Sequence, residues 1–348
     1  MKQPNLKILK GRGAQINPAN RFHEQYYETE WEQDERTEYI TVHPKTILNK
    51  VDSPDIGMAW SMNPYQGCEH GCVYCYARNT HNYWGYSAGL DFEQKILVKK
   101  NAAKLLEQKI QNKNWEAAAI MLSGNTDCYQ PAEAKFGITR EILEVLWKYR
   151  HPVGLITKNS LILRDLDLLK PLAEKKLLKV SISLTSLDEA VRRMLEPRTA
   201  SVAQRLKTIE VLAKAGISVN VMLAPIIPGI NSHEVMAMAK KVADLGARSI
   251  AYTIVRLNGD VAKIFEDWIR KMMPARADKV LNKIKECHGG QLSDSRFKQR
   301  MVGEGHTAEI IRQQVQLARR LYFSDKEKLV YDTELHQQYK SPQLKLNF

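Results

Sequence analysis

The fold of this 348-residue chain is decided by one stretch, Asn63-Pro64-Tyr65-Gln66-Gly67-Cys68-Glu69-His70-Gly71-Cys72-Val73-Tyr74-Cys75-Tyr76-Ala77-Arg78. Its cysteines follow the spacing C-x3-C-x2-C. Three thiolates on one short loop can each bind one iron of a cubane [4Fe–4S] cluster and leave the fourth iron open to another ligand. Gly67 and Gly71 let the backbone of such a loop wrap closely around the metal. The spacing therefore favours a cluster with an open coordination position.

Three other interpretations of these cysteines stay open. A structural zinc site needs four ligands, and His70 or His81 could supply the fourth, although C-x3-C-x2-C is an unusual zinc spacing. A redox pair of Cys72 and Cys75 would leave Cys68 without a role. Three inert buried cysteines would fit poorly in a loop that is rich in Gly, Tyr and Asn.

Short apolar strands alternate with helical segments around this stretch. The predicted strands are Met58–Met62, Ala117–Leu122, Val153–Thr157, Leu178–Leu184, Ile217–Leu223 and Ile250–Val255. From the second strand on, their starts lie 25 to 39 residues apart, which is the length of a strand plus a crossover helix. Ser201 and Gln204 form a capping box that opens one of these helices, and Gly216 ends it. Six βα units predict a doubly wound sheet or an incomplete β/α barrel, with the chemistry at the carboxyl ends of the strands.

Composition divides the chain into three regions. Residues 1–50 are predicted as an N-terminal extension, in which the acidic, aromatic stretch Tyr26–Glu38 is a short helix or an arm. Residues 51–260 hold the βα units, and residues 261–348 form a basic helical region with helices over Ala262–Met273, Ala277–Cys287 and Thr307–Tyr322. The two flanking regions could form a lid, because an open six-unit barrel leaves its side exposed.

Charge and cysteine content limit the class of protein. The 52 basic side chains outnumber the 39 acidic ones, and residues 151–300 carry +11 of the net charge of +13. Such a surface favours nucleic acid, or an acidic electron-donor protein, as a partner. Five cysteines, an odd number, argue against a disulfide framework. No apolar run reaches the length of a membrane span and no signal or transit pattern opens the sequence, so a cytoplasmic protein without membrane contact is expected.

The cysteine stretch carries a resemblance to a known family. Cys68, Cys72 and Cys75, with Tyr74 before the last cysteine, resemble the signature of the radical S-adenosylmethionine (radical SAM) superfamily. The flanking residues resemble the spore photoproduct lyase-like branch, often labelled DNA repair photolyase, and an uncharacterised family that opens with a GRGA…NP.NRF stretch like residues 11–22. The resemblance covers nearly the whole chain. It implies a partial (β/α)6 barrel whose cluster, on these three cysteines, binds S-adenosylmethionine at the open iron.

The resemblance also assigns contacts to the cofactor at the ends of successive strands. A glycine-rich edge after the second strand would contact the methionyl amino group, Lys158 the methionyl carboxylate, and Ser183 the ribose. Arg198 is a further candidate, since arginine binds carboxylates bidentately. The segment Leu223–Gly229 would offer an apolar surface to the adenine. The full set of predicted cofactor-binding residues is Tyr74, Gly124, Asn125, Thr126, Lys158, Ser183 and Arg198.

The expected activity is that of a radical SAM enzyme of lyase or oxidoreductase type. One electron from a small flavodoxin- or ferredoxin-type protein would cleave S-adenosylmethionine, and the resulting 5′-deoxyadenosyl radical would abstract hydrogen from the substrate. That substrate could be a nucleic acid, or a protein or small metabolite; the alternative of another class is a non-catalytic, zinc-stabilised nucleic-acid-binding module. Cys128 could return hydrogen to a product radical. Spore photoproduct lyase has such a cysteine, but at the position where this chain has Gly124, which argues against thymine-dimer repair. Cys287 has no assigned role.

Overall fold

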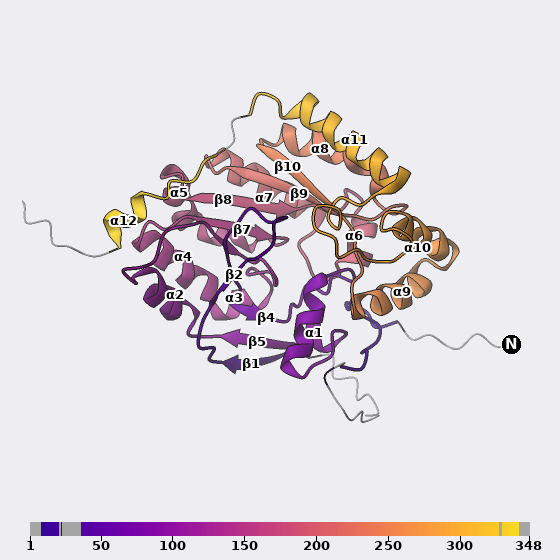
Figure 1. The fold of residues 1–348 in the computed structure, drawn as a ribbon, viewed down its shortest axis with the longest axis horizontal. Coiled ribbons are helices and arrows are strands. Elements are labelled where there is room, and N and C mark those ends of the chain that lie inside the picture. Colours follow the sequence, from indigo (N-terminus) through magenta and orange to yellow (C-terminus); the bar gives the residue numbers. More distant parts are fainter. Residues whose placement is uncertain (1–7, 21, 23–35, 327–328, 341–348) are drawn as a thin grey trace, which may run out of the picture.

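A computed structural model describes residues 8–20, 22, 36–326 and 329–340 of the chain (Figure 1). The centre of the fold is a seven-stranded sheet with the order β10-β9-β8-β7-β6-β3-β2. Its strands are β2 (Leu48–Lys50), β3 (Trp60–Met62), β6 (Ile120–Leu122), β7 (Val153–Thr157), β8 (Leu178–Ser183), β9 (Val219–Ile226) and β10 (Ser249–Ile254). Most of the predicted arm, Tyr26–Glu38, lies outside the described residues.

Six strands of this sheet correspond to the six predicted strands: β3, β6, β7, β8, β9 and β10. Each of them pairs in parallel with the next one in this order. Strand β2 adds to β3 in the antiparallel direction. The sheet does not close, because β10 and β2 are its two edges. The fold is therefore a partial barrel, and the expectation of a (β/α)6 barrel is confirmed.

Buried strands and one-sided helices explain this arrangement. Strand β7 has four of its five residues buried, as expected for a parallel strand that helices cover. Helix α7 (Val202–Lys214) begins with the predicted capping box and buries Val202, Ile209 and Leu212. The helices between the barrel strands are α2 (Ala102–Ile110), α3 (Ala132–Phe136), α4 (Ile138–Lys148), α5 (Leu166–Glu174), α6 (Glu189–Leu195), α7 and α8 (Val235–Asp244).

A second, small sheet lies beside the barrel and was not predicted. It has the order β1-β5-β4, where β1 is Glu38–Val42, β4 is Tyr65–Gln66 and β5 is Lys95–Lys99 (Figure 1). Strand β4 lies inside the quoted stretch and directly precedes the first cysteines. The helical turns η1 (Tyr76–Trp84) and α1 (Asp91–Gln94) connect the cysteine loop to β5. The small sheet thus anchors both ends of that connection.

The C-terminal region is helical, as predicted. It contains α9 (Asp260–Met272), α10 (Ala277–Glu286), α11 (Gly305–Tyr322) and α12 (Leu335–Tyr339). Helix α11 packs against α8 on the outside of the barrel (Figure 1). In the described ranges, we find no helix with the length and apolar character that crossing a bilayer requires.

Candidate active site

The three cysteines lie on one loop at the wall of a single cavity. The loop is fixed at its start, where the amide of Cys68 donates to the carbonyl of Phe92 at 2.8 Å, and in its middle, where Val73 donates to Leu195 at 3.1 Å. Cys68 and Cys72 are buried, Cys75 is partly exposed, and all three are free thiols. The loop therefore presents three unpaired sulfur ligands to the same space.

That space is a cavity of about 380 Å³ at the carboxyl ends of the barrel strands, a volume in the range of small-molecule sites. Its wall combines the cysteine loop with residues from the ends of β6 to β10. Among the lining residues are Cys68, His70, Cys72, Tyr74, Cys75, Tyr76, Gly124, Asn125, Asp127, Lys158, Ser183, Met222, Ala224, Pro225, Arg256 and Arg300. The cavity thus has the position that the fold assigns to an active site.

Burial keeps the thiols of Cys68 and Cys72 protonated in the metal-free chain. Burial raises the pKa of Cys72 to about 12, a rise that the nearby Lys158 partly offsets, and it raises the pKa of Cys68 well above its ordinary value. Metal binding must therefore displace protons from these thiols. Within the described ranges, no three Cys, His, Asp or Glu side chains converge closely enough to share a single metal ion. Three ligands for three separate irons of one cluster do not need such convergence.

Of the two histidines that could have completed a zinc site, His70 is paired with a carboxylate and His81 lies outside the cavity. His70 Nδ1 lies 3.3 Å from Asp127 Oδ2, and Asp127 also accepts hydrogen bonds from Thr157 Oγ1 and from the amide of Lys158, both at 2.8 Å. Burial opposes the charge of Asp127, but His70 and these donors lower its pKa to about 2. His81 is buried against Phe92 and does not line the cavity. Asp127 therefore ties the cysteine loop to the ends of β6 and β7.

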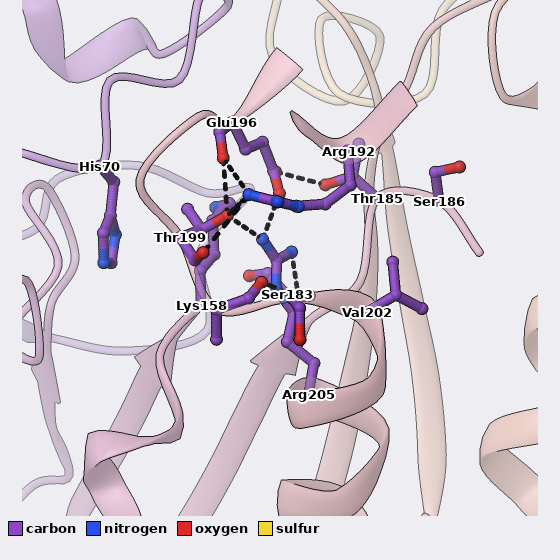
Figure 2. A network of polar contacts seen from close by, with 12 residues as sticks. His70, Lys158, Ser183, Thr185, Ser186, Arg192, Glu196, Thr199, Val202 and Arg205 are labelled. Atoms are coloured by element: carbon purple, nitrogen blue, oxygen red, sulfur yellow. Dashed lines mark hydrogen bonds and ion pairs between the residues drawn. The ribbon is translucent and has the colours of Figure 1, made fainter. Parts of the chain in front are cut away.

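A buried ion pair organises the end of β8 (Figure 2). Arg205 binds Glu196, and its Nη1 donates to the carbonyl of Ser183 at 3.0 Å. Glu196 also accepts from Thr185 Oγ1 at 2.6 Å and from the hydroxyl of Tyr74. The network therefore fixes both the backbone of Ser183 and the ring of Tyr74, two residues of the cavity wall.

This ion pair predicts a specific pH dependence of stability. Burial opposes the charge of Glu196, but Arg205 and Lys158 lower its pKa to about 2, below the ordinary 4.5. A depressed pKa contributes stability that is present above pH 4.5 and is lost as the pH falls toward 2, on the order of 3 kcal/mol. The difference in free energy of unfolding between wild type and Glu196→Gln should therefore be constant from pH 7 to 5 and shrink below pH 4.5. Urea titrations measure it, and an undiminished difference at pH 3 would contradict the assignment.

A segment of the N-terminal extension supports the cysteine loop from behind. The carboxylate of Glu93 accepts from the amides of Gly13 at 3.1 Å and Ala14 at 2.8 Å, and it forms a fully buried ion pair with Arg78 at 2.5 Å. Arg78 Nε in turn donates to the carbonyl of Cys72 at 2.9 Å. The GRGA stretch, residues 11–14, is thereby linked through two charged side chains to the middle cysteine.

Five of the seven predicted cofactor-binding residues line the cavity with the three cysteines. They are Tyr74, Gly124, Asn125, Lys158 and Ser183. Gly124 lies so close to β3 that a Cβ there would overlap Ser61 Oγ. No hydrogen bond or ion pair involves the ammonium group of Lys158 in the part of the chain that the structure describes. Burial alone would lower its pKa, but Cys72 and Glu196 raise it above the ordinary value, so Lys158 is a cation.

Three of the predicted site residues do not reach the cavity wall. Thr126 is buried, and its hydroxyl donates to the carbonyl of Tyr65 at 2.6 Å. Arg198 lies behind the cysteine loop, where its amide donates to the carbonyl of His70 at 3.3 Å. Cys128 is fully buried in the main core. The prediction of a carboxylate clamp at Arg198 and of a hydrogen donor at Cys128 is therefore not supported by their positions.

The position of Cys128 yields a direct test. Its amide donates to Ser123 Oγ and its carbonyl accepts from Thr139 Oγ1, both at 2.6 Å, so the backbone holds the thiol in the core. We expect Cys128→Ser to leave substrate turnover unchanged and to lower the free energy of unfolding by about 1–3 kcal/mol, because it buries a hydroxyl. Turnover and urea unfolding check this. If Cys128→Ser lost turnover while its free energy of unfolding stayed that of the wild type, Cys128 would again be a candidate hydrogen donor.

Among the residues of the cavity wall that the sequence interpretation missed are Tyr76 and two arginines. The hydroxyl of Tyr76 donates to the carbonyl of Gly124 at 2.5 Å and joins the cysteine loop to the end of β6. Arg256 follows β10, and Arg300 belongs to the segment between α10 and α11. Tyr76 could have been found from its place beside Cys75, whereas no local pattern distinguishes the two arginines from solvated ones.

Together, the partial barrel and the thiol-lined cavity at the carboxyl ends of its strands are typical of an α/β enzyme. The family model described as the radical SAM superfamily matches residues 62–242. The chain belongs to the radical SAM superfamily. This membership implies a [4Fe–4S] cluster and S-adenosylmethionine as its cofactors. The alternative prediction of a non-catalytic, zinc-stabilised nucleic-acid-binding module is therefore wrong.

The chain is also similar to proteins of known sequence and of known structure. An uncharacterised protein of Mycobacterium tuberculosis is 31% identical over 241 residues, which cover 68% of this chain and 71% of the relative. An uncharacterised protein of Methanocaldococcus jannaschii is 26% identical over 249 residues, 71% of this chain and 88% of the relative. The structure of spore photoproduct lyase complexed with dinucleoside spore photoproduct superimposes with a TM-score of 0.61 at 16% identity, over 84% of this chain and 82% of the other. At that identity the likeness concerns the fold.

Proposed function

We propose that this chain holds a [4Fe–4S] cluster on Cys68, Cys72 and Cys75, binds S-adenosylmethionine in the adjoining cavity, and abstracts hydrogen from a nucleic-acid substrate. The observation that carries the proposal is the shared cavity, which the three free thiols line together with Lys158 and Ser183. When bound, the cluster and S-adenosylmethionine supply a 5′-deoxyadenosyl radical that takes a hydrogen atom from the substrate.

The residues of the cavity wall fit the parts of S-adenosylmethionine. Lys158 offers the methionyl carboxylate a cation whose ammonium group makes no hydrogen bond or ion pair among the described residues, and Gly124 and Asn125 offer polar groups to the amino end. Ser183, whose backbone Arg205 fixes, can bind the ribose. Met222, Ala224 and Pro225 give the adenine an apolar surface.

Two segments outside the barrel strands, one just after the N-terminal extension and one in the C-terminal region, would help to keep water out of this cavity. Ile56 follows the extension and Met301 precedes α11, and both line the cavity. Asp55 accepts from the amide of Lys298 at 2.7 Å and pairs with Arg300 at 2.6 Å, which joins the two segments. Exclusion of water protects a reactive species from side reactions. Residues 55–56, which lie just after the predicted extension, and residues 298–301 of the C-terminal region would therefore help to close the cavity.

The basic composition of residues 151–300, which carry +11 of the net charge of +13, supports a nucleic acid as the substrate. A protein or small-molecule substrate is the second candidate. The observation that favours it is a relative from Bacillus subtilis, named antilisterial bacteriocin subtilosin biosynthesis protein AlbA, which is 29% identical over 54% of this chain and 37% of its own length. Phosphate contacts release counterions, so binding of DNA or RNA that weakens steeply with salt separates the two candidates.

A second basic hollow supports an acidic electron-donor protein, of flavodoxin or ferredoxin type, as a partner. His233, Arg276, Lys279 and Lys283 line it, and the buried face of α10 behind it packs in the same core as Cys72 and Val73. A donor that docks there would lie close to the cysteine loop. The rate at which flavodoxin reduces the cluster should then fall when salt is added, and it should also be lower in the variant Lys279→Glu. An unchanged rate in both cases would contradict docking at this hollow.

The proposed function is tested by anaerobic reconstitution of the full chain with iron and sulfide. About four irons per chain should be retained, because three thiolates and the cofactor complete one cubane. With dithionite and S-adenosylmethionine, the protein should release 5′-deoxyadenosine, measured by chromatography. Mass analysis of DNA, RNA and peptides incubated with it then identifies the substrate. A chain that retains iron but releases no 5′-deoxyadenosine would contradict the proposal.

A further inference from the structure

The cations of the cavity wall outnumber its anions. Lys158, Arg256 and Arg300 line the cavity, whereas Asp127 is the only carboxylate among the described residues that do so. Asp127 is engaged by His70, Thr157 and the amide of Lys158. Counted over these lining residues, positive charge therefore exceeds negative charge.

Two of these three cations have an assigned task. Lys158 fits the methionyl carboxylate in the function proposed above. Arg300 is held by Asp55, with 2.6 Å from its Nε to Oδ2, and by Ser53 Oγ, which accepts from its Nη2 at 2.6 Å. The third cation, Arg256, has no such task, because no hydrogen bond or ion pair involves its guanidinium across the described ranges. A partly buried charge without a partner is costly, which is why such groups mark binding sites.

The backbone holds Arg256 firmly in place at the end of the last barrel strand. On one side the amide of Val255 donates to the carbonyl of Ile226 at 2.9 Å, and on the other the amide of Leu257 donates to the carbonyl of Leu292 at 2.8 Å. Burial and the like charge of Arg300 lower the pKa of Arg256, so an anion beside both arginines would relieve their repulsion. The site is therefore positioned in advance for an anionic ligand.

We propose that Arg256, with Arg300 beside it, binds a phosphate group of the nucleic-acid substrate inside the cavity; this rests on the proposed function. The guanidinium fork matches the oxygens of a phosphate bidentately. A phosphate is favoured over a carboxylate because residues 151–300, which include Arg256 and Arg300, carry +11 of the net charge of +13, and such an excess of positive charge suits a chain of phosphates rather than one acidic group. Arg256 is thus a substrate-binding residue that selects for a phosphate close to the reacting carbon.

The test measures binding, independently of radical chemistry. Fluorescence anisotropy of single-stranded DNA and RNA oligonucleotides of random sequence is recorded with the reconstituted full chain, its Arg256→Ala and Arg256→Lys variants and the control Arg320→Ala. Arg320 is a matched control, because it is an exposed arginine in the last turn of α11. We expect Arg256→Ala to weaken binding about tenfold and to lower the slope of log affinity against log salt by about 0.7, as for one lost phosphate contact. Arg256→Lys should restore part of the affinity, and Arg320→Ala should weaken binding less than twofold.

Competition at constant ionic strength identifies the anion. Inorganic phosphate should displace the oligonucleotide from wild type but not from Arg256→Ala, and succinate should displace it from neither. Equal affinities of Arg256→Ala and Arg320→Ala, or displacement by succinate as effective as by phosphate, would overturn the proposal. Melting temperatures show which variants are folded, and Arg256→Lys carries the test if the alanine variant is not. Release of 5′-deoxyadenosine by the wild type is scored separately, so failure of the proposed function is distinguishable from failure of this site.

Discussion

Replacing Cys72 with alanine is expected to abolish the cluster and the chemistry that depends on it. Cys72 is the middle cysteine of the loop, it is buried, and it lines the cavity with Cys68 and Cys75. Alanine supplies no ligand, and water has little access to replace the lost thiolate at a buried position. We expect iron retention after desalting to fall from about four atoms per chain to below one, and release of 5′-deoxyadenosine to fall at least about 100-fold.

A second cysteine of this chain provides the matched control. Cys287 is also fully buried, but it belongs to the main core and does not line the cavity. Cys287→Ala should keep its iron and its activity. Metal-free Cys72→Ala should unfold close to wild type, because the thiol of Cys72, with a pKa raised by burial, is a neutral, protonated group in that form. Full iron content and an unchanged electron paramagnetic resonance signal in Cys72→Ala would falsify the cluster assignment.

The barrel could be predicted because each of its units is a local pattern. A buried strand, a capped helix and a turn recur within a span of 25 to 39 residues, and all six strands appear where the pattern placed them. The small sheet could not be predicted in this way. Its strand β4 has only two residues, and β1 pairs in parallel with β5 more than fifty residues later in the chain. Pairing over that distance leaves no periodicity in the sequence.

The site residues at the carboxyl ends of the strands could be predicted, whereas those in the loops that follow the strands could be predicted much less well. Parallel strands bring their carboxyl ends to one edge of the sheet, so Gly124, Lys158 and Ser183, which the family resemblance singles out, were expected to lie together there. Which way a side chain points after a strand end depends on tertiary contacts. For this reason Arg198 lies behind the cysteine loop rather than in the cavity, and Arg256, which follows β10, could not be distinguished from a solvated arginine.

The GRGA stretch supports the second large prediction, for the variant Gly13→Ala. A Cβ at Gly13 would overlap the carbonyl oxygen of Gly71, lie 2.8 Å from its carbonyl carbon and 3.1 Å from Val73 Cγ1. Gly71 lies between Cys68 and Cys72, so the clash falls on the cysteine loop itself. Either the loop moves, or residues 11–14 leave Glu93 without the two amides that it accepts from. Overpacking of this kind costs about 1–3 kcal/mol.

The movement of the loop, rather than a general loss of stability, is the outcome that matters. We expect Gly13→Ala to melt about 2–10 °C lower than wild type and to retain several-fold less iron at a temperature where both proteins are folded. Gly57→Ala is the matched control, because a Cβ at Gly57 meets nothing within 4 Å and the residue adjoins Ile56 of the cavity wall. Melting curves, iron content and the electron paramagnetic resonance signal of the reduced cluster are the measurements. If Gly13→Ala keeps the iron content and signal of Gly57→Ala, the N-terminal stretch does not position the cluster loop, and its contacts with Glu93 serve stability alone.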